Sequence, residues 1–315
     1  MLVAYHLARR TLPAHACKFS RHDFTLAQLF ACLVVREFFG LSYRRVEALL
    51  ADSPAWLAEI GLSKAPDHNT LWRAFDALLV GRRCQRMLDL LAELFAREKL
   101  LTTHRCNRPL AIDSTCFEPR HRSRHYDRRC RRMSDDAWKH PGKWGKTVNA
   151  ARAKKLRRMP KLAIAVDSGC HLILGAKVRI GNRSDAPDFD DLLYQAWRRA
   201  KVRVVVADAG YDSEANHCIA RQDMRVRSII PPGIGRPTSK PPTGRWRRLL
   251  AQRFKRKADR KLYGQRSQSE TVPSMIKRNM SSALRSRTPA RQKKEMMLRV
   301  LVHNIMLLCP DETEG

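Results

Sequence analysis

The spacing of apolar residues changes near residue 108, and that change limits the fold more than any other feature of the chain. Between residues 23 and 100 the apolar residues recur at helical intervals, in the segments FTLAQLFACLVVREFF, YRRVEALLAD, HNTLWRAFDALL and CQRMLDLLAELFARE. Beyond residue 108 they form short runs bounded by turn residues, which is typical of strands. We therefore expect a helical first region, residues 1–105, and an α/β region, residues 106–315.

The order of elements in the α/β region predicts its topology. Strands are expected over PLAIDSTCFE, KLAIAVDS and HLILGAKVRI, the last two joined as a hairpin through Ser168 and Gly169. A helix with an acidic start and a basic end (DAPDFDDLLYQAWRRA) follows, then a strand (VRVVVADAGYDS), a short helix and a last strand (VRSIIPP). This order is the plan of a ribonuclease-H-like mixed sheet flanked by helices. A basic loop, residues 231–261, and two helices, around 263–284 and 294–308, should complete the chain.

The charge of the chain indicates its partner. Lys and Arg total 62 against 30 Asp and Glu, a net charge of +32 and a pI near 10.7. Like charges at this density destabilise a compact chain, so we expect a polyanion to balance them. An acidic membrane is the alternative, but the sequence has no lipidation signal or basic amphipathic anchor. Double-stranded DNA, with its dense phosphates, is the expected partner.

Several classes of protein are disfavoured. The nine cysteines include no C-x-x-C pair and no zinc-finger spacing, so we expect neither structural zinc nor a disulfide framework, in keeping with a reducing cytosol. The longest apolar stretch, residues 26–35, is too short to span a membrane. The first residues lack a secretory signal pattern, and we expect a bacterial cytoplasmic, nucleoid-associated protein.

Two aspartates stand where apolar strands end. Asp113 follows Leu-Ala-Ile, and Asp208 follows Val-Val-Val-Ala. Carboxylates at the ends of adjacent strands meet at one edge of a sheet, where Mg²⁺ or Mn²⁺ can be held. Two such ions, about 3.5–4 Å apart, activate the attacking oxygen and stabilise the leaving oxygen in phosphoryl transfer. Acidic residues also end strands simply because the chain turns there.

A third group lies near the end of the chain. Tyr263, Arg266, Glu270 and Lys277 have offsets of 0, 3, 7 and 14, which place them within a stripe about 60° wide on one helix. A carboxylate beside cations and a phenol suits a phosphodiester, because the carboxylate completes a metal site while the cations bind phosphate oxygens. The alternative is a solvated face with ordinary ion pairs.

These motifs resemble those of insertion-sequence DDE transposases. The pattern Y-x2-R-x3-E-x6-K in YGQRSQSETVPSMIK is similar to their YREK signature, and AIDSTCFE and DAGY resemble their motifs around the first two aspartates. The resemblance implies that Asp113, Asp208 and Glu270 are the catalytic metal ligands, with two Mg²⁺ or Mn²⁺ ions per site. It also implies DNA contacts near the cleaved phosphate for Tyr263, Arg266 and Lys277.

The activity implied by that resemblance is transposition, a form of DNA recombination. The protein would act as an endonuclease at the terminal inverted repeats of its insertion sequence, as a homodimer on paired ends. It would then join the 3′ ends to target DNA.

Two further surfaces are expected to bind DNA. The segment from Arg245 to Lys261 holds nine Lys or Arg, and we expect DNA contacts there from Trp246, Arg247, Arg248, Arg253, Lys255, Arg256 and Lys257. Trp246 is either a stacking platform or a structural anchor. In the first region, Arg44, Arg45 and Arg73 suit a helix-turn-helix DNA reader, or else the solvated face of an ordinary bundle. His121 and His125 are expected on a basic DNA-facing surface.

The sequence departs from the family pattern at two positions. Pro273, inside the expected helix, removes a backbone donor at a cost of roughly 3 kcal/mol, and Ser267 stands where an aromatic residue is often found. The helix either kinks or begins a new turn, or the copy is decayed.

The rival hypotheses are an impaired copy that only binds specific DNA sequences, a ribonuclease-H-like nuclease without strand joining, and a basic RNA-binding structural protein. The remaining acidic candidates are expected to be caps and surface partners: Asp167, Asp185, Asp188, Asp212 and Glu214.

Overall fold

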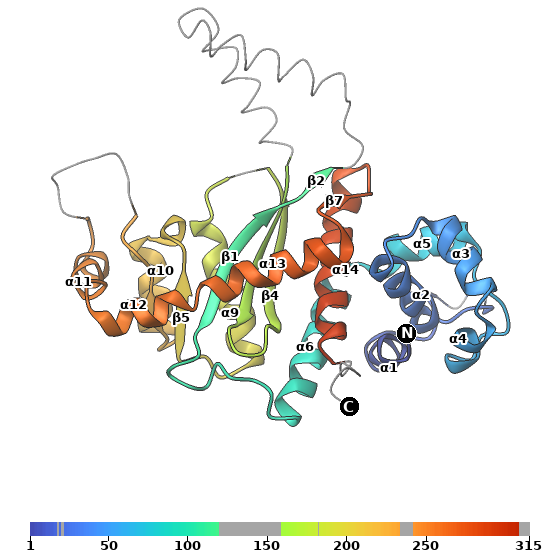
Figure 1. The fold of residues 1–315 in the computed structure, drawn as a ribbon, viewed down its shortest axis with the longest axis horizontal. Coiled ribbons are helices and arrows are strands. Elements are labelled where there is room, and N and C mark those ends of the chain that lie inside the picture. The colour runs from blue at the N-terminus through green and yellow to red at the C-terminus, as the bar shows by residue number, and fades with distance from the viewer. Residues whose placement is uncertain (18, 20–21, 120–158, 182, 234–241, 309–315) are drawn as a thin grey trace, which may run out of the picture.

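The helical first region and the sheet region both form as the apolar spacing predicts (Figure 1). The structure is a computed structural model that describes residues 1–315 except 18, 20–21, 120–158, 182, 234–241 and 309–315. His121 and His125 therefore lie outside the described residues. The first region comprises α1 (Leu2–Thr11), α2 (Leu26–Phe38), α3 (Tyr43–Ala51), α4 (Pro54–Glu59), α5 (His68–Leu78) and α6 (Gly81–Arg97).

Local signals account for several helix starts in this region. Thr25 and Gln28 form a reciprocal capping box at the start of α2, in which each side chain accepts from the other residue's amide. Asp67 caps α5 by accepting from the amide of Asn69 at 2.7 Å. Helices α1 and α4 were not predicted.

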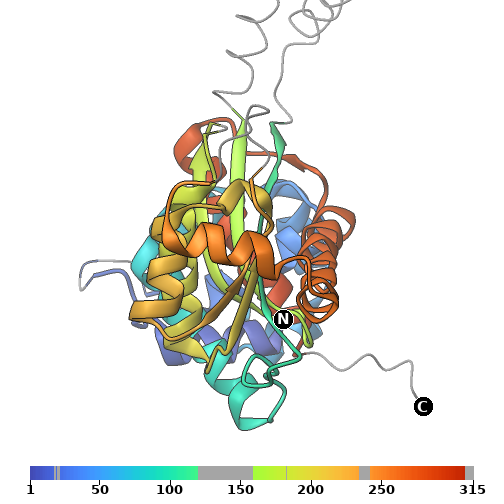
Figure 2. The same cartoon turned by 90° about the vertical axis from the view of Figure 1, so that its left-hand side faces the viewer.

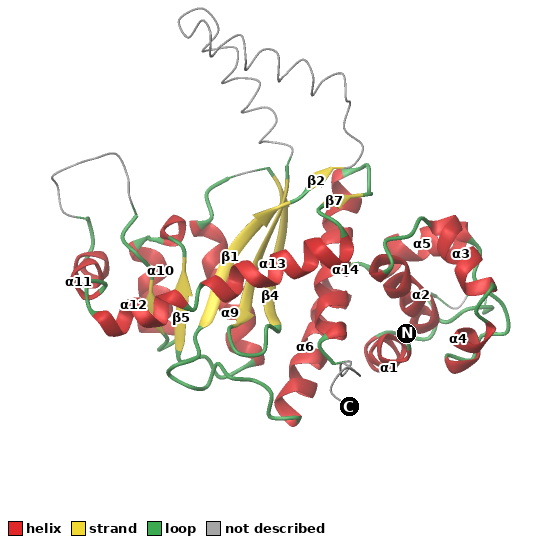
Figure 3. Cartoon of the chain, viewed as in Figure 1, coloured by secondary structure: helices red, strands yellow, loops and turns green. Residues whose placement is uncertain are grey.

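The second region is built on a five-stranded mixed sheet in the order β4-β3-β1-β5-β6 (Figure 3). Strand β1 is antiparallel to β3 and parallel to β5, which confirms the predicted ribonuclease-H-like topology. The strands are β1 (Leu110–Cys116), β3 (Pro160–Asp167), β4 (Ile173–Ile180), β5 (Val204–Ala207) and β6 (Arg227–Ile229), and two short strands, β2 (Glu118–Pro119) and β7 (Ala283–Leu284), pair separately.

Helices cover both faces of the sheet (Figure 2). Leu110 and Ile112 of β1 pack with α9 (Phe189–Arg199), whereas Leu162 and Ile164 of β3 belong to the core on the opposite face. The remaining helices are α10 (Glu214–Cys218), α11 (Arg245–Arg253), α12 (Lys257–Gly264), α13 (Ser267–Met280) and α14 (Pro289–Met306), with short turns η1 (Ala186–Asp188), η2 (Ala209–Tyr211) and η3 (Ile219–Asp223).

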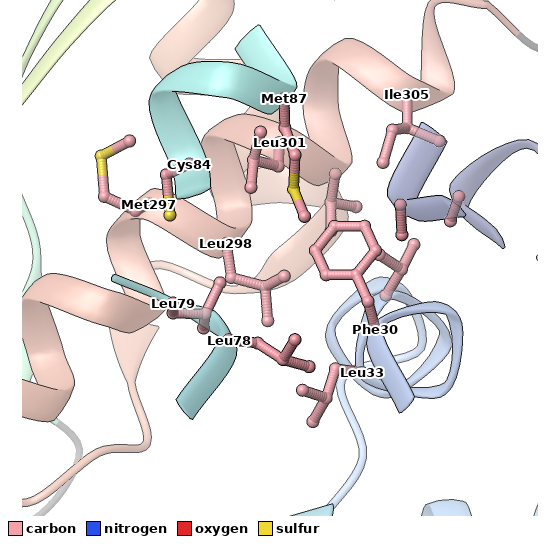
Figure 4. Packing of buried hydrophobic residues seen from close by; sticks show 14 of the residues in the cluster. Phe30, Leu33, Leu78, Leu79, Cys84, Met87, Met297, Leu298, Leu301 and Ile305 are labelled. Atoms are coloured by element: carbon pink, nitrogen blue, oxygen red, sulfur yellow. The ribbon is translucent and has the colours of Figure 1, made fainter. Parts of the chain in front are cut away.

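Helix α14 joins the two regions. Figure 4 shows its residues Leu298, Leu301 and Ile305 packed with Phe30 of α2 and Met87 of α6, in one cluster that also reaches β3 and β4. On its other side, the Asn304 side chain bonds both backbone groups of Ile173 on the edge strand β4, at 3.0 and 2.9 Å. The first region and the sheet therefore share one hydrophobic core.

A buried group of charges accompanies this packing. Glu37 of α2 and Glu295 and Arg299 of α14 are fully buried, with Arg299 bonded to Glu37 at 2.9 Å and to Glu295 at 3.0 Å. Arg36 adds a second cation 3.2 Å from Glu37. The Arg299 guanidinium also donates to the carbonyl of Ser281, directly after α13. The network ties the first region to the segment that follows α13.

Two expectations about helices were wrong. The single helix expected over 263–284 is divided between α12 and α13, because successive i→i+3 bonds at Gln265 and Arg266 tighten the chain into a turn. The basic loop expected over residues 231–261 instead contains α11 and the first part of α12. Within the described residues, no single helix is long and apolar enough to cross a membrane; α2 and α3 meet that test only as a pair bent by 110°.

Candidate active site

Asp113 and Asp208 occupy neighbouring positions on the adjacent strands β1 and β5. Asp208 directly follows β5, as predicted, but the prediction that Asp113 ends its strand was wrong: β1 continues to Cys116 because these residues still pair with β3. The parallel register pairs Ile112 with Ala207, so the two aspartates are the next residues on adjacent strands. Asp113 is largely buried, whereas Asp208 is exposed at the start of η2, where its carboxylate accepts from the amide of Gly210 at 3.2 Å. The predicted convergence of these two carboxylates at one sheet edge is present.

Helix α13 brings the third carboxylate to the same edge. Arg266, directly before α13, contacts Asp113 at 3.4 Å and Glu270 at 2.5 Å. One guanidinium therefore bridges carboxylates that lie 157 positions apart in the sequence. Glu270 itself is exposed.

The charge state of Asp113 reflects these neighbours. Burial raises the pKa of Asp113, and the carboxylates of Asp208 and Glu270 raise it further. The amide of Ser114 and the guanidinium of Arg266 oppose that rise. Carboxylate oxygens are the hard donors that suit Mg²⁺ or Mn²⁺. The chemistry of these three residues therefore suits a divalent ion, while their ligand atoms do not all lie within 4.8 Å of one another and Arg266 occupies two of the carboxylates.

A second cluster of possible metal ligands lies in the first region. Among the described residues, only Glu47, Asp67 and His68 have ligand atoms that all lie within 4.8 Å of one another. Their contacts serve the start of α5, because Glu47 accepts from the His68 amide and Asp67 caps the helix. This cluster joins α3 to α5 and is separate from the sheet edge.

The other residues of the expected YREK set surround the carboxylates. Tyr263 is half-buried on α12, and the Arg266 guanidinium lies 5.9 Å from its ring centroid. Burial raises the pKa of the Tyr263 phenol, Arg266 opposes that rise, and Asp208 and Asp113 add to it. Lys277 donates a 2.6 Å hydrogen bond to Thr115 of β1. The four residues gather at the site although they do not share one helix.

Pro273 does not end the helix that carries Glu270. Helix α13 continues from Ser267 to Met280 with Pro273 in its interior. The proline is buried, and it lines the same groove as Asp113 and Glu270. The departure from the family pattern therefore leaves Glu270 and Lys277 on one helix.

The basic segment of α11 and α12 is attached to the body by acidic residues. The Glu214 carboxylate accepts from the amides of Trp246 and Arg247 at 2.9 and 3.0 Å, and so caps α11. Gly244 precedes the helix with φ of 100°, and a Cβ atom there would lie 2.2 Å from the Glu214 carboxylate. Asp212 binds the Arg247 guanidinium at 2.8 Å.

The predicted DNA contacts on this segment differ in their exposure. The side chains of Arg248, Arg253, Lys255, Arg256 and Lys257 are exposed. Arg247 forms an ion pair with Asp212. Trp246 is half-buried, and the guanidinium groups of Arg221 and Arg245 lie 5.2 and 5.7 Å from its ring centroid. In the first region, Arg44, Arg45 and Arg73 are all exposed.

The remaining acidic candidates have partners within the protein. Asp167 is buried and accepts from the amides of Thr102 and Thr103. Asp188 binds Arg179 at 2.6 Å, and Asp185 binds both Lys161 and Arg179. Asp185 also accepts from the Ser114 hydroxyl at 3.2 Å, beside Asp113.

Sequence reasoning missed part of the groove at this site. Its lining also includes Thr115, Ser274, Arg278 and Ser282. Two signals were available. Thr115 shares the face of Asp113 by strand alternation, and Ser274 and Arg278 follow Glu270 at helical spacing.

The fold and this arrangement of carboxylates define a ribonuclease-H-like nuclease or transposase. Comparison with protein families separates the two: the family model described as "Transposase DDE domain" matches residues 104–305, about two thirds of the chain. A second model, "Transposase domain (DUF772)", matches residues 5–77. The chain belongs to the DDE transposases of insertion sequences, a family that generally uses divalent metal ions and acts on DNA.

Proposed function

We propose that the protein cuts DNA at the terminal inverted repeats of an insertion sequence and joins the freed 3′ ends to target DNA, as a member of the YREK-bearing class. The observation that carries this proposal is the bridge by which Arg266 contacts both Asp113 and Glu270, beside Asp208. In this proposal Asp113, Asp208 and Glu270 would hold two Mg²⁺ or Mn²⁺ ions. The ions would supply Lewis-acid activation of the attacking oxygen and neutralisation of the leaving oxygen.

The protein's own residues position the reacting phosphate. Arg266 is already held by two carboxylates, and Lys277 is held by Thr115, so both cations are placed before DNA binds. Preorganised cations stabilise the charge that develops on phosphate oxygens in the transition state. Water is the nucleophile in the first reaction and releases a 3′-OH, and that hydroxyl is the nucleophile in the second. No covalent bond to the protein is required.

Binding of the DNA ends is assigned to the first region. Residues 1–105 form the proposed end-binding region, and residues 106–315 form the catalytic domain with its basic segment 231–261. Arg44, Arg45 and Arg73 are exposed on α3 and α5, as a helix-turn-helix reader requires. We place the protein as a homodimer on paired ends, in the bacterial cytoplasm and associated with the nucleoid.

The catalytic assignment is tested by Asp113→Asn. This change keeps the shape of the side chain but removes the charge, so we expect cleavage and joining to be lost while DNA-end binding remains. The matched control is Asp223→Asn, because the Asp223 carboxylate is exposed and forms no hydrogen bond or ion pair with the described residues. If Asp113→Asn cleaves end DNA in Mg²⁺ as fast as the control, the assignment is wrong. Pre-cut ends distinguish a transposase, which joins them, from a nuclease, which does not.

A further inference from the structure

A groove lined mostly by residues with polar side chains extends from the carboxylates along α13. It has a volume of about 540 Å³ and lies between α13 and the outer half of β1. Asp113 and Glu270 line it, and its other polar lining residues are Ser114, Thr115, Ser274, Lys277, Arg278 and Ser282. Apart from the two carboxylates, these side chains are hydroxyl or cationic donors, which is the chemistry that binds phosphate.

The direction of the groove follows from the helix. Glu270, Ser274, Lys277 and Arg278 have offsets of 0, 4, 7 and 8, which place them on one face about 100° wide. From Glu270 to Arg278 the helix rises about 12 Å. One strand of B-DNA rises about 3.4 Å per nucleotide, so this length matches three to four nucleotides.

The two cations in the groove differ in their partners. Lys277 donates to Thr115, and its amine lies 5.4 Å from the centroid of the Phe117 ring. The Arg278 guanidinium is exposed and forms no hydrogen bond or ion pair with any residue that the structure describes. A cation near the end of α13 also suits the helix dipole. The dipole does not explain why this guanidinium shares a groove with the catalytic carboxylates.

We propose that the groove holds one DNA strand next to the cleaved phosphate, and that Arg278 binds a backbone phosphate of that strand. This inference rests on the proposed function, and it adds a substrate contact outside the YREK set. A guanidinium can bind two oxygens of one phosphate at once, which fixes the strand as well as attracting it. Because the donors reach phosphate rather than bases, the contact applies to any sequence at that position.

The test compares Arg278→Gln with Arg198→Gln. Arg198 is the matched control because its side chain, like that of Arg278, is exposed near the end of a helix and forms no ion pair with described residues. It lies on α9, on the opposite face of the sheet. The probe is a fluorescein-labelled duplex that carries the terminal repeat flanking the gene and extends past the cleavage site. Binding is measured by anisotropy in a chelator at several salt concentrations, so no cleavage occurs.

We expect the Arg278→Gln variant to bind about tenfold more weakly at low salt. The salt slope, which is the slope of the logarithm of the binding constant against the logarithm of the salt concentration, should fall in magnitude by about 0.9, the value for one lost phosphate contact. Arg198→Gln should bind like the unaltered protein. In a second series of duplexes, one phosphate beside the cleavage site is replaced by a neutral methylphosphonate, at a different position in each duplex. At one position this replacement should weaken binding by the unaltered protein but have no effect on binding by Arg278→Gln. Arg278→Lys should restore most of the salt slope.

Two results would overturn the inference: an unchanged salt slope in Arg278→Gln, or a loss that is the same at every methylphosphonate position. Both are independent of catalysis. If Asp113→Asn fails to abolish cleavage, the proposed function fails whatever Arg278 does. If Asp113→Asn behaves as expected but Arg278→Gln binds normally, only the strand path is wrong.

Discussion

The Nε atom of Arg299 lies 2.9 Å from Oε1 of Glu37, and neither side chain is exposed although 262 positions separate them. Burial raises the pKa of Glu37, and the nearby guanidinium of Arg299 opposes that rise. The Arg299 cation therefore compensates the buried charge of Glu295 and shares with Arg36 the compensation of Glu37.

Replacing Arg299 by Met should strongly destabilise the protein. Removal of one partner from a buried ion pair leaves an uncompensated charge and costs about 3–5 kcal/mol. Urea unfolding measures the change. The control is Arg287→Met, an exposed arginine without described partners, for which we expect a change within about 0.5 kcal/mol. Equal stability of the two variants would contradict the proposed importance of the network.

The hydrogen bond from Lys277 to Thr115 should matter for catalysis. Lys277→Met is expected to slow single-turnover cleavage by about 100-fold, the effect of losing one preorganised donor. Thr115→Val keeps the amine but releases it, so we expect a smaller loss, about tenfold. Combined with Lys277→Met, Thr115→Val should cause no further loss. Additive losses would show that Thr115 acts independently of Lys277.

Pro273→Ala should make the protein more stable. Alanine restores an amide donor inside α13, where proline costs roughly 3 kcal/mol. Loss of the buried ring methylenes opposes this by about 0.8 kcal/mol for each. We expect a net gain of about 1–2 kcal/mol in urea unfolding, with cleavage retained. Large destabilisation would mean instead that the ring is required to fill the core beside Val272 and Ile276.

His303 should make stability depend on pH. Burial lowers the pKa of His303 to about 4, and its Nε2 atom lies 3.1 Å from the carbonyl of His171. The folded protein keeps this imidazole neutral, whereas the unfolded chain takes up a proton below its ordinary pKa of about 6.5. Stability from this group is therefore complete above about pH 6.5 and falls as the pH drops towards 4.

This prediction is measured as the difference between two proteins. Between pH 7.5 and 4.5, His303 should contribute a loss of about 2.5 kcal/mol in unfolding free energy. His303→Gln cannot take up a proton, so its stability should fall by that much less over the same range. The same pH dependence in both proteins would refute the assignment of this effect to His303.

Much of the candidate site could be predicted because its signals are local. The apolar runs before Asp113 and Asp208 placed the two aspartates on adjacent strands, although only Asp208 lies at a strand end, and the antiparallel and parallel pairings follow from the order of elements. The ordered motifs around Glu270 then connected a distant helix to the same edge. That a single guanidinium, Arg266, would contact two of the three carboxylates did not follow from spacing.

The two errors in predicting helices have different causes. One depends on a contact far away in the sequence, and the other on a helix-ending residue that was overlooked. Helix α11 begins where Glu214, about 30 positions earlier, caps it, and no feature near Arg245 indicates that contact. The division between α12 and α13 had a local sign in Gly264, the last residue of α12, because glycine commonly ends helices. The offsets of Tyr263 and Arg266 were calculated as if one helix ran through this turn.

The position of α14 has a consequence for synthesis of the protein. Residues 289–306 complete the core of α2 and α6, which also pack against α1, and Arg299 within them neutralises Glu37. A ribosome that has made only the first helices has therefore produced a chain in which one apolar side of α2 and α6 and the charge of Glu37 lack the partners that α14 supplies. The DNA-end-binding region proposed here should mature only after the catalytic domain has been translated, so messages truncated before codon 289 would not produce a folded fragment able to occupy the element ends and block transposition.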